Sequence, residues 1–182
     1  RYDDADDGYD AIVISNIGTT ADDKADVTVT NSVYADKNDY VENFTAGTDL
    51  VKIGGTLKTS LEASGAVVVT AGSDGTTLNY NATGILIIDN GDRVLAADGT
   101  AAFLDISDVA TKFNAEVTSS NGAAGDEILF TIEDSSHAQT GLYYLKFGAA
   151  NATGQIAATD TLALLAVFNE DDFVAATVTV TA

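Results

Sequence analysis

Short runs of apolar and β-branched residues recur along this chain, and Gly, Asn or Asp separates most of them. Runs of this length predict β-strands, because such side chains fit a pleated, buried surface and the intervening residues favour tight turns. The predicted strands are residues 11–15, 26–30, 50–53, 66–70, 77–80, 85–88, 94–95, 127–132, 142–147, 162–168 and 174–181. This pattern indicates an all-β fold, with a β-sandwich or β-roll as the first choice.

Two stretches have the four-residue spacing of a helix instead. Within residues 57–63, two leucines lie four positions apart, which predicts a short helical turn. Within residues 107–117, apolar residues recur every four positions, and Ser107 or Asp105 can cap the first turn. We therefore expect one or two short helices beside the strands.

One turn signal predicts which strands are partners. The dipeptide Asp74-Gly75 lies between the predicted strands 66–70 and 77–80. Asp-Gly is favoured in two-residue hairpin turns, because both positions tolerate a positive φ. The sequence therefore predicts that these two strands form a hairpin.

The predicted strands 85–88 and 174–181 contain no charged residue, and the chain has no Pro. Lys, Pro and bulges normally prevent an exposed edge strand from pairing with another chain. Two interpretations stay open. The strands could join copies of the chain into a polymer or lattice, or both could lie inside the protein's own sandwich.

Composition narrows the classes of function. The chain has 182 residues, of which 46% are hydrophobic, so it can form one domain of ordinary size or two small ones. Its 28 acidic and 8 basic residues give a formal net charge of -20. This charge repels nucleic acid and attracts divalent cations. No run of about 18 apolar residues occurs, so we expect no membrane insertion. Cys is absent, so no disulfide can stabilise the fold. A small secreted domain without disulfides needs another source of stability, and a bound metal or self-association would serve.

Carboxylates bracket a turn in residues 39–53. Asp39 and Asp49 lie on either side of Gly47, with Glu42 between them, and apolar residues alternate around them. A turn that buries those apolar residues brings the two aspartates together. Neighbouring carboxylates repel unless a cation lies between them, and an all-oxygen ligand set suits Ca²⁺.

The same stretch reads D-x-V-x-x-F-x-x-G-x-D-x-V-x-I. It resembles the D-x-I-x-x-F-x-x-G-x-D-x-I segment that closes the calcium-binding β-roll of RTX proteins. These proteins leave Gram-negative bacteria by type I secretion and include serralysin-type proteases, large adhesins and some surface-layer proteins. The resemblance implies an extracellular or cell-surface location and a calcium-dependent fold.

A second segment, residues 5–13, resembles one RTX nonapeptide of the form G-G-x-G-x-D-x-U-x. Gly8 and Asp10 match this form, whereas Ala5 and Asp6 stand in place of its two leading glycines. We expect four calcium ligands, and they are Asp7, Asp10, Asp39 and Asp49. Weaker candidates are Asp89, Asp92, Asp171 and Asp172.

Catalytic signatures are missing from the sequence. His137 is the only histidine, and its neighbours in Asp134-Ser135-Ser136 do not make a triad, because triad partners converge from separate elements. We therefore expect His137 to be a loop residue and the protein not to be an enzyme.

The sequence thus predicts a β-sandwich with a short β-roll-like N-terminal part. Residues 1–53 would form an acidic, RTX-like calcium-binding segment and residues 54–182 a sandwich-like module, unless residues 1–182 are one continuous domain. The expected function is a secreted structural or adhesive module of a surface layer, filament or adhesin, which self-associates and could also bind surface polysaccharide. Two alternatives are the C-terminal secretion and folding module of an extracellular hydrolase and a carbohydrate-binding module.

Overall fold

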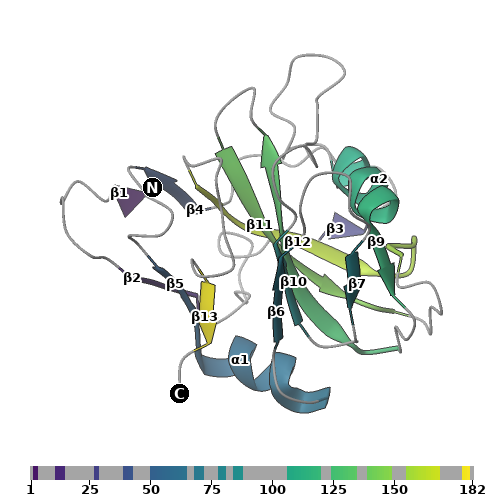
Figure 1. Ribbon diagram of the computed structural model, residues 1–182, viewed down its shortest axis with the longest axis horizontal. Helices are drawn as coiled ribbons and strands as arrows, with labels where there is room; N and C mark the ends of the chain where they lie inside the picture. The colour runs from purple at the N-terminus through teal and green to yellow at the C-terminus, as the bar shows by residue number, and fades with distance from the viewer. Residues whose placement is uncertain are drawn as a thin grey trace.

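A computed structural model of the chain describes residues 2–3, 11–14, 27–28, 39–42, 50–64, 68–71, 78–80, 84–87, 106–119, 124–134, 139–148, 155–168 and 178–180. Its helices are α1 (Gly55–Leu61), which continues into the 3-10 turn η1 (Glu62–Ser64), and α2 (Ile106–Glu116). Its strands are β1 (Tyr2–Asp3), β2 (Ala11–Ile14), β3 (Val27–Thr28), β4 (Asp39–Glu42), β5 (Leu50–Ile53), β6 (Val68–Ala71), β7 (Leu78–Tyr80), β8 (Gly84–Ile87), β9 (Val117–Ser119), β10 (Glu127–Asp134), β11 (Gln139–Lys146), β12 (Thr161–Phe168) and β13 (Val178–Val180). The described part is mainly β with two short helices, which confirms that much of the prediction (Figure 1).

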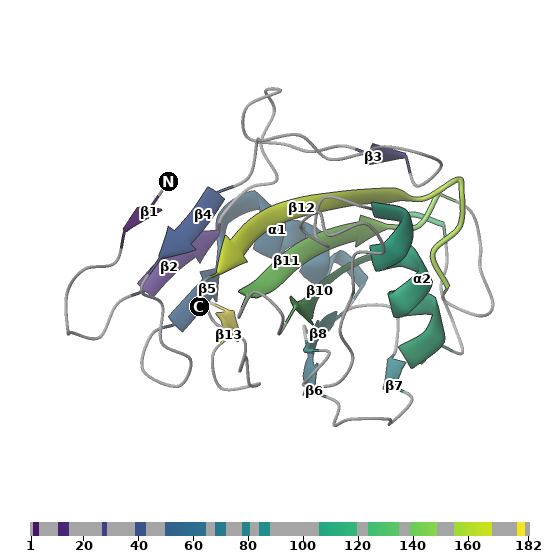
Figure 2. The same ribbon diagram turned by 90° about the horizontal axis from the view of Figure 1, so that it is seen from above.

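One mixed sheet forms the centre of the molecule, in the order β1-β4-β12-β11-β10-β8-β6, with β3 also paired to β12. The strands β10, β11 and β12 are antiparallel to one another, and each is eight residues long. Figure 2 shows these three strands side by side. The outer strands β8 and β4 join this block in parallel, to β10 and β12 respectively.

The long strands are buried on both faces. In β12, every residue from Leu162 to Phe168 is buried, and β11 is buried from Thr140 to Leu145. A strand covered on one face only would alternate between apolar and polar residues. The continuous apolar runs therefore reflect packing of other elements against both faces of the sheet.

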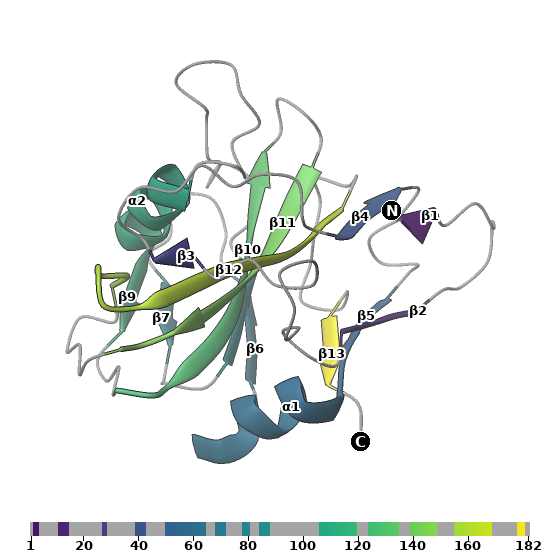
Figure 3. The same cartoon turned by 180° about the vertical axis from the view of Figure 1, so that it is seen from behind.

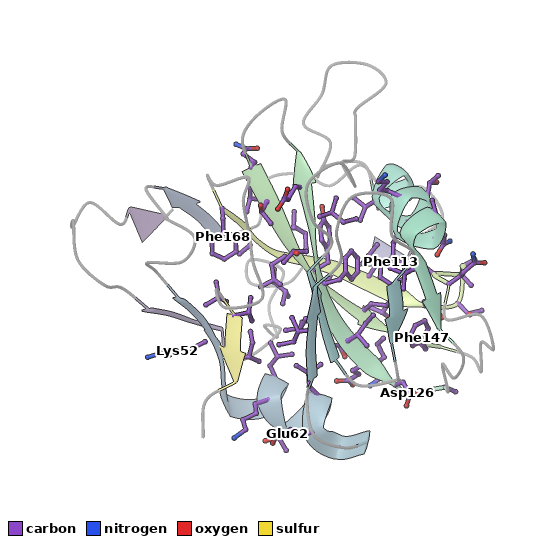
Figure 4. The ribbon with its side chains drawn as sticks, viewed as in Figure 1. Lys52, Glu62, Phe113, Asp126, Phe147 and Phe168 are labelled. Carbon is purple, nitrogen blue, oxygen red and sulfur yellow. The ribbon has the colours of Figure 1, made fainter. Side chains whose placement is uncertain are left out.

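Each face has its own layer. On one face, α1, β5 and β13 pack against the sheet in a core that we call the α1-side cluster. Its members are Val51, Ile53, Leu57, Leu61, Ile85, Leu129, Leu142, Tyr144, Ala163, Leu165, Ala166, Phe168 and Val178. On the other face lies the α2-side cluster, in which Phe113 of α2 contacts Phe130 at a ring-centroid distance of 4.6 Å and Phe130 stacks on Tyr143 at 5.0 Å. Leu129 and Phe130 are consecutive in β10, so they point to opposite faces. Figure 4 shows Phe168 and Phe113, one from each cluster.

A second, three-stranded sheet of β2, β5 and β13 belongs to the α1 side. Its order is β13-β5-β2, and all pairings are parallel. Figure 3 shows it beside α1, at the side of the molecule where the C-terminus lies. A two-stranded sheet of β7 and β9 is also parallel.

The predicted hairpin between residues 66–70 and 77–80 is wrong. The strand β6 pairs in parallel with β8, and β7 pairs in parallel with β9. Asp-Gly favours a reversal of the chain, but it does not decide which strands pair. The apolar strand β8, which lies between β10 and β6, takes the place beside β6 that the prediction gave to β7.

The open question about the two uncharged strands has two different answers. The strand β8, from the predicted strand 85–88, lies inside the large sheet. The strand β13, from the predicted strand 174–181, lies at the edge of the three-stranded sheet as far as the described strands show. Of these two strands, only β13 therefore lies at a sheet edge, which is the position from which a strand can pair with another chain.

Both helices occur where the sequence predicts them. The helix α1 covers the two leucines four apart, and both are buried against the sheet, at 1% and 0% exposed. The helix α2 turns Val109 and Phe113 inward, and both side chains are fully buried. The four-residue spacing was therefore sufficient to identify the buried face of each helix.

Candidate functional site

Only one of the four predicted calcium ligands falls within the described residues. Asp39 is the first residue of β4, and its register partner is Ala166 of β12. Asp7, Asp10 and Asp49 lie outside the described residues. The weaker candidates Asp89, Asp92, Asp171 and Asp172, and also His137, lie outside them.

The strands that follow two of these aspartates are neighbours in the three-stranded sheet. Ala11, the first residue of β2, is the register partner of Leu50, the first residue of β5. In the sequence, Asp10 immediately precedes Ala11 and Asp49 immediately precedes Leu50. The two RTX-like segments, which are well separated in the chain, therefore supply adjacent parallel strands that begin at the same level.

Asp39 belongs to a different sheet. Its strand β4 pairs with β12 and β1, whereas β5 pairs with β2 and β13. The two halves of the 39–53 motif thus form no strand pair with each other. Among the described residues, no group of three or more His, Cys, Asp or Glu side chains is arranged to hold a metal ion. In the same part of the chain, no helix is long and apolar enough to cross a membrane.

The best-defined charged site in the described residues is one that sequence reasoning did not identify. Glu127 of β10 and Lys146 of β11 are register partners, and the Lys146 Nζ donates to Glu127 Oε1 at 2.8 Å. Glu127 is 8% exposed, whereas the Lys146 side chain is 48% exposed. Ser60 of α1 and Tyr144 of β11 also hydrogen-bond the Glu127 side chain. We call β10 and β11 together the central hairpin. The carboxylate thereby joins α1 to the open end of this hairpin, where β10 begins and β11 ends.

The environment of Glu127 favours its charged form. Burial raises the pKa of Glu127, but the hydrogen bonds from Lys146, Ser60 and Tyr144 and the charge of Lys146 together lower it below the ordinary value of 4.5. The carboxylate therefore stays ionised and paired at neutral pH. The ion pair therefore joins β10 to β11 and has a structural role.

Further polar residues follow Glu127 along the same face of β10. Thr131 and Glu133 are fully buried there, and so is Thr140, the register partner of Glu133 on β11. Alternation along the strand places Glu127, Thr131 and Glu133 on the α1 side.

Another buried carboxylate, that of Asp160, shapes the connection between β11 and β12. Asp160 is 1% exposed, and its Oδ1 accepts from the Gly148 backbone N–H at 2.9 Å. Its Oδ2 accepts from the Ala157 backbone N–H at 2.8 Å. A side chain at Gly148 would clash with the backbone carbonyl of Thr159, so glycine is required for this close approach. Asp160 thus stabilises the start of β12, as aspartate often does in turns.

The same connection is also tied to α2. The Ile156 backbone N–H donates to Asn114 Oδ1 at 2.6 Å, and Asn114 Nδ2 donates to the Ile156 carbonyl at 3.0 Å. Gln155 Nε2 donates to the Asn114 carbonyl at 3.1 Å. These three bonds fix the end of α2 over the β11–β12 connection and have no evident chemical role beyond that.

No family model, curated protein or solved structure matches this chain in the comparisons. The RTX resemblance therefore stays a prediction from the two motifs. The function has to be argued from the residues and from the strands that they precede.

Proposed function

We propose that this chain is a secreted, calcium-binding structural or adhesive module without enzymatic activity, acting at the bacterial cell exterior in a surface layer, filament or adhesin. The observation that carries the proposal is the register of Ala11 with Leu50, since an aspartate precedes each of them. The RTX resemblance adds the secretion route. The finer architecture, a β-sandwich with a β-roll-like N-terminal part, belongs to the same proposal.

Neighbouring strands lie about 4.8 Å apart, and one residue adds about 3.8 Å of chain. Carboxylates attached directly before two paired residues can therefore approach one Ca²⁺, which takes oxygen ligands at about 2.3–2.6 Å. Asp10 and Asp49 are the central ligands of this proposal, and Asp7 and Asp39 are the other two candidates.

The charge of the chain explains why a cation would matter. At a net charge of -20, the folded state concentrates negative charge that the unfolded chain spreads out. A cation bound only by the folded state stabilises it by RT ln(1 + [L]/Kd), about 2.7 kcal/mol at a hundredfold excess over Kd. Folding would thus be favoured outside the cell, where calcium is abundant.

Thermal unfolding and circular dichroism with and without millimolar calcium test this proposal. We expect a higher melting temperature in calcium, and we expect Asp10→Ala and Asp49→Ala each to reduce that increase. The matched control is Asp98→Ala, which removes the same charge from an Asp-Gly sequence outside the two motifs. Equal melting temperatures in chelator and calcium would refute calcium binding, and equal losses from all three variants would show that net charge alone explains the effect.

A further inference from the structure

The last described strand of the chain contributes to the core although it lies at a sheet edge. Val178 of β13 is 2% exposed and belongs to the α1-side cluster, together with Val51 and Ile53 of β5. In the parallel register, Val178 is the partner of Val51 and Val180 is the partner of Ile53. The strand β13 therefore occupies a specific position beside β5 and is not a loosely attached end.

Within the described residues, β5 is the only strand that pairs with β13. The strand β13 contains no charged residue and no Pro, the two features that commonly prevent edge strands from pairing with other chains. Among the described strands, the pairing of β13 therefore runs across one edge only. If β13 leaves its own β5 and pairs with the β5 of another copy, the strand pairings of the central sheet stay the same.

We propose that β13 is an exchanged strand, so that Val178–Val180 of one copy occupies the position beside β5 of the next copy. The occupant is fixed by the sequence itself, because a second copy carries the identical segment and can reproduce the same register. Residues 169–177 separate β12 from β13. A fully extended stretch of that length reaches roughly 30 Å, which is enough to span to a neighbouring molecule.

This inference rests on the self-association part of the proposed function, and it identifies β13 as the segment through which the copies associate. Each copy donates one strand and accepts one. Two copies that exchange strands with each other form a closed dimer, whereas copies that each donate to the next form a head-to-tail contact. Such a contact builds a filament when it does not close into a ring. The main-chain bonds of an added strand supply affinity, and the buried side chain of Val178 supplies register.

Cysteine cross-linking tests the exchange directly, because the chain contains no cysteine of its own. Lys52 and Thr179 are register partners on β5 and β13. Figure 4 shows the Lys52 side chain directed away from the core, so its replacement leaves the α1-side cluster intact. Lys52→Cys and Thr179→Cys are placed on separate full-length chains, which are mixed in denaturant, refolded in millimolar calcium and oxidised.

The expected product is a disulfide-linked pair of chains with a junction between positions 52 and 179, identified by mass spectrometry. Thiols held on paired strands meet at millimolar effective concentration, so at roughly 10 micromolar protein we expect on the order of 100-fold more of this junction than random collision gives. The matched control mixes Lys52→Cys with Ala115→Cys, which replaces an exposed residue of α2 in the other layer.

The outcomes separate the two proposals. Particles that grow in calcium and carry the 52–179 junction between chains support the exchange. Particles that grow but show this junction no more often than the Ala115→Cys control overturn the exchange and leave the proposed function standing. A mixture that stays monomeric at high concentration in calcium overturns the self-associating function and the exchange together.

Discussion

The central block of β10, β11 and β12 and the small sheet of β2, β5 and β13 are built from the chain in opposite ways. The central strands are eight residues long, and they lie within residues 127–168. The strands of the small sheet have three or four residues, and they come from residues 11–14, 50–53 and 178–180. The central pairings are antiparallel, whereas those of the small sheet are all parallel.

This difference has a thermodynamic consequence. Bringing together strands that are far apart in the chain costs more conformational entropy than closing a hairpin. The short parallel pairs of the small sheet also form fewer hydrogen bonds than the long antiparallel pairs, so less stabilisation offsets this larger cost. The central block can therefore form from local contacts, whereas the small sheet depends on additional stabilisation. The proposed calcium site and the proposed strand exchange would both act on the small sheet, so variants in the two regions should respond differently to calcium.

The largest effect is expected in the central block. Phe130→Ala removes the ring that lies between Phe113 and Tyr143 in the α2-side cluster. Deletion of a buried phenylalanine costs about 3–5 kcal/mol, through lost transfer energy and the cavity that remains. Urea unfolding should show this loss, and calcium should not restore it. Ala115→Ser, at an exposed position of α2, should change the free energy of unfolding by less than about 0.5 kcal/mol.

Most of the described strands and both helices could be predicted from the sequence, because hydrophobic spacing records which side of an element is buried. The pairing of the strands could not. The strands β7 and β9 are partners although residues 81–116 separate them, and no local pattern records such a contact. The Asp74-Gly75 dipeptide favours a hairpin, but β6 pairs with β8 and β7 pairs with β9 instead.

The same distinction applies to the candidate site. The motif spacing indicated Asp10 and Asp49 as calcium ligands, but the register that links their strands became apparent only from the fold. The pairing of Glu127 with Lys146 depends on the register of β10 with β11, which a sequence pattern does not specify. Asp160 was missed because its two partners are backbone N–H groups, which carry no residue-type signal.

Asp160→Ala is expected to have the second largest effect. It leaves the backbone N–H groups of Gly148 and Ala157 without their carboxylate acceptor. Hydrogen bonds to a charged group contribute about 1.5–3 kcal/mol, so we expect a loss of about 2–3 kcal/mol by urea unfolding. Asp160→Asn keeps one oxygen acceptor and should recover part of this loss. An unchanged free energy of unfolding in Asp160→Ala would mean that the connection is held by other contacts.

Val178→Ala probes the small sheet, where the total loss is smaller. Truncating this buried valine should cost about 2 kcal/mol. Hydrogen exchange should then rise in residues 50–53 and 178–180, whereas residues 127–134 and 139–146 stay protected. The matched variant is Val109→Ala, the same truncation at a fully buried position of α2. Calcium should restore protection in Val178→Ala and not in Val109→Ala, and equal behaviour of the two variants would show that the regions unfold together.

The smallest effect concerns Glu127, which joins the central hairpin to α1. Since Lys146 is half exposed and solvent screens the pair, Glu127→Gln should cost only about 1 kcal/mol at neutral pH. The pKa of Glu127 in the folded protein lies below the unfolded value, so the unfolded state binds the proton more tightly. The stabilisation is therefore complete above the ordinary glutamate pKa of 4.5 and is lost as the pH falls through the lowered pKa.

Urea unfolding across the acidic range, for the wild type and for Glu127→Gln, measures this contribution. The difference between the two proteins should be greatest at neutral pH and should disappear in acid, once the wild-type carboxyl is protonated. Lys146→Gln should reduce the difference without abolishing it, because the hydrogen bonds from Ser60 and Tyr144 remain. A gap that stays constant down to strong acid would show that the hydrogen-bonding shape of Glu127, and not its charge, links the hairpin to α1.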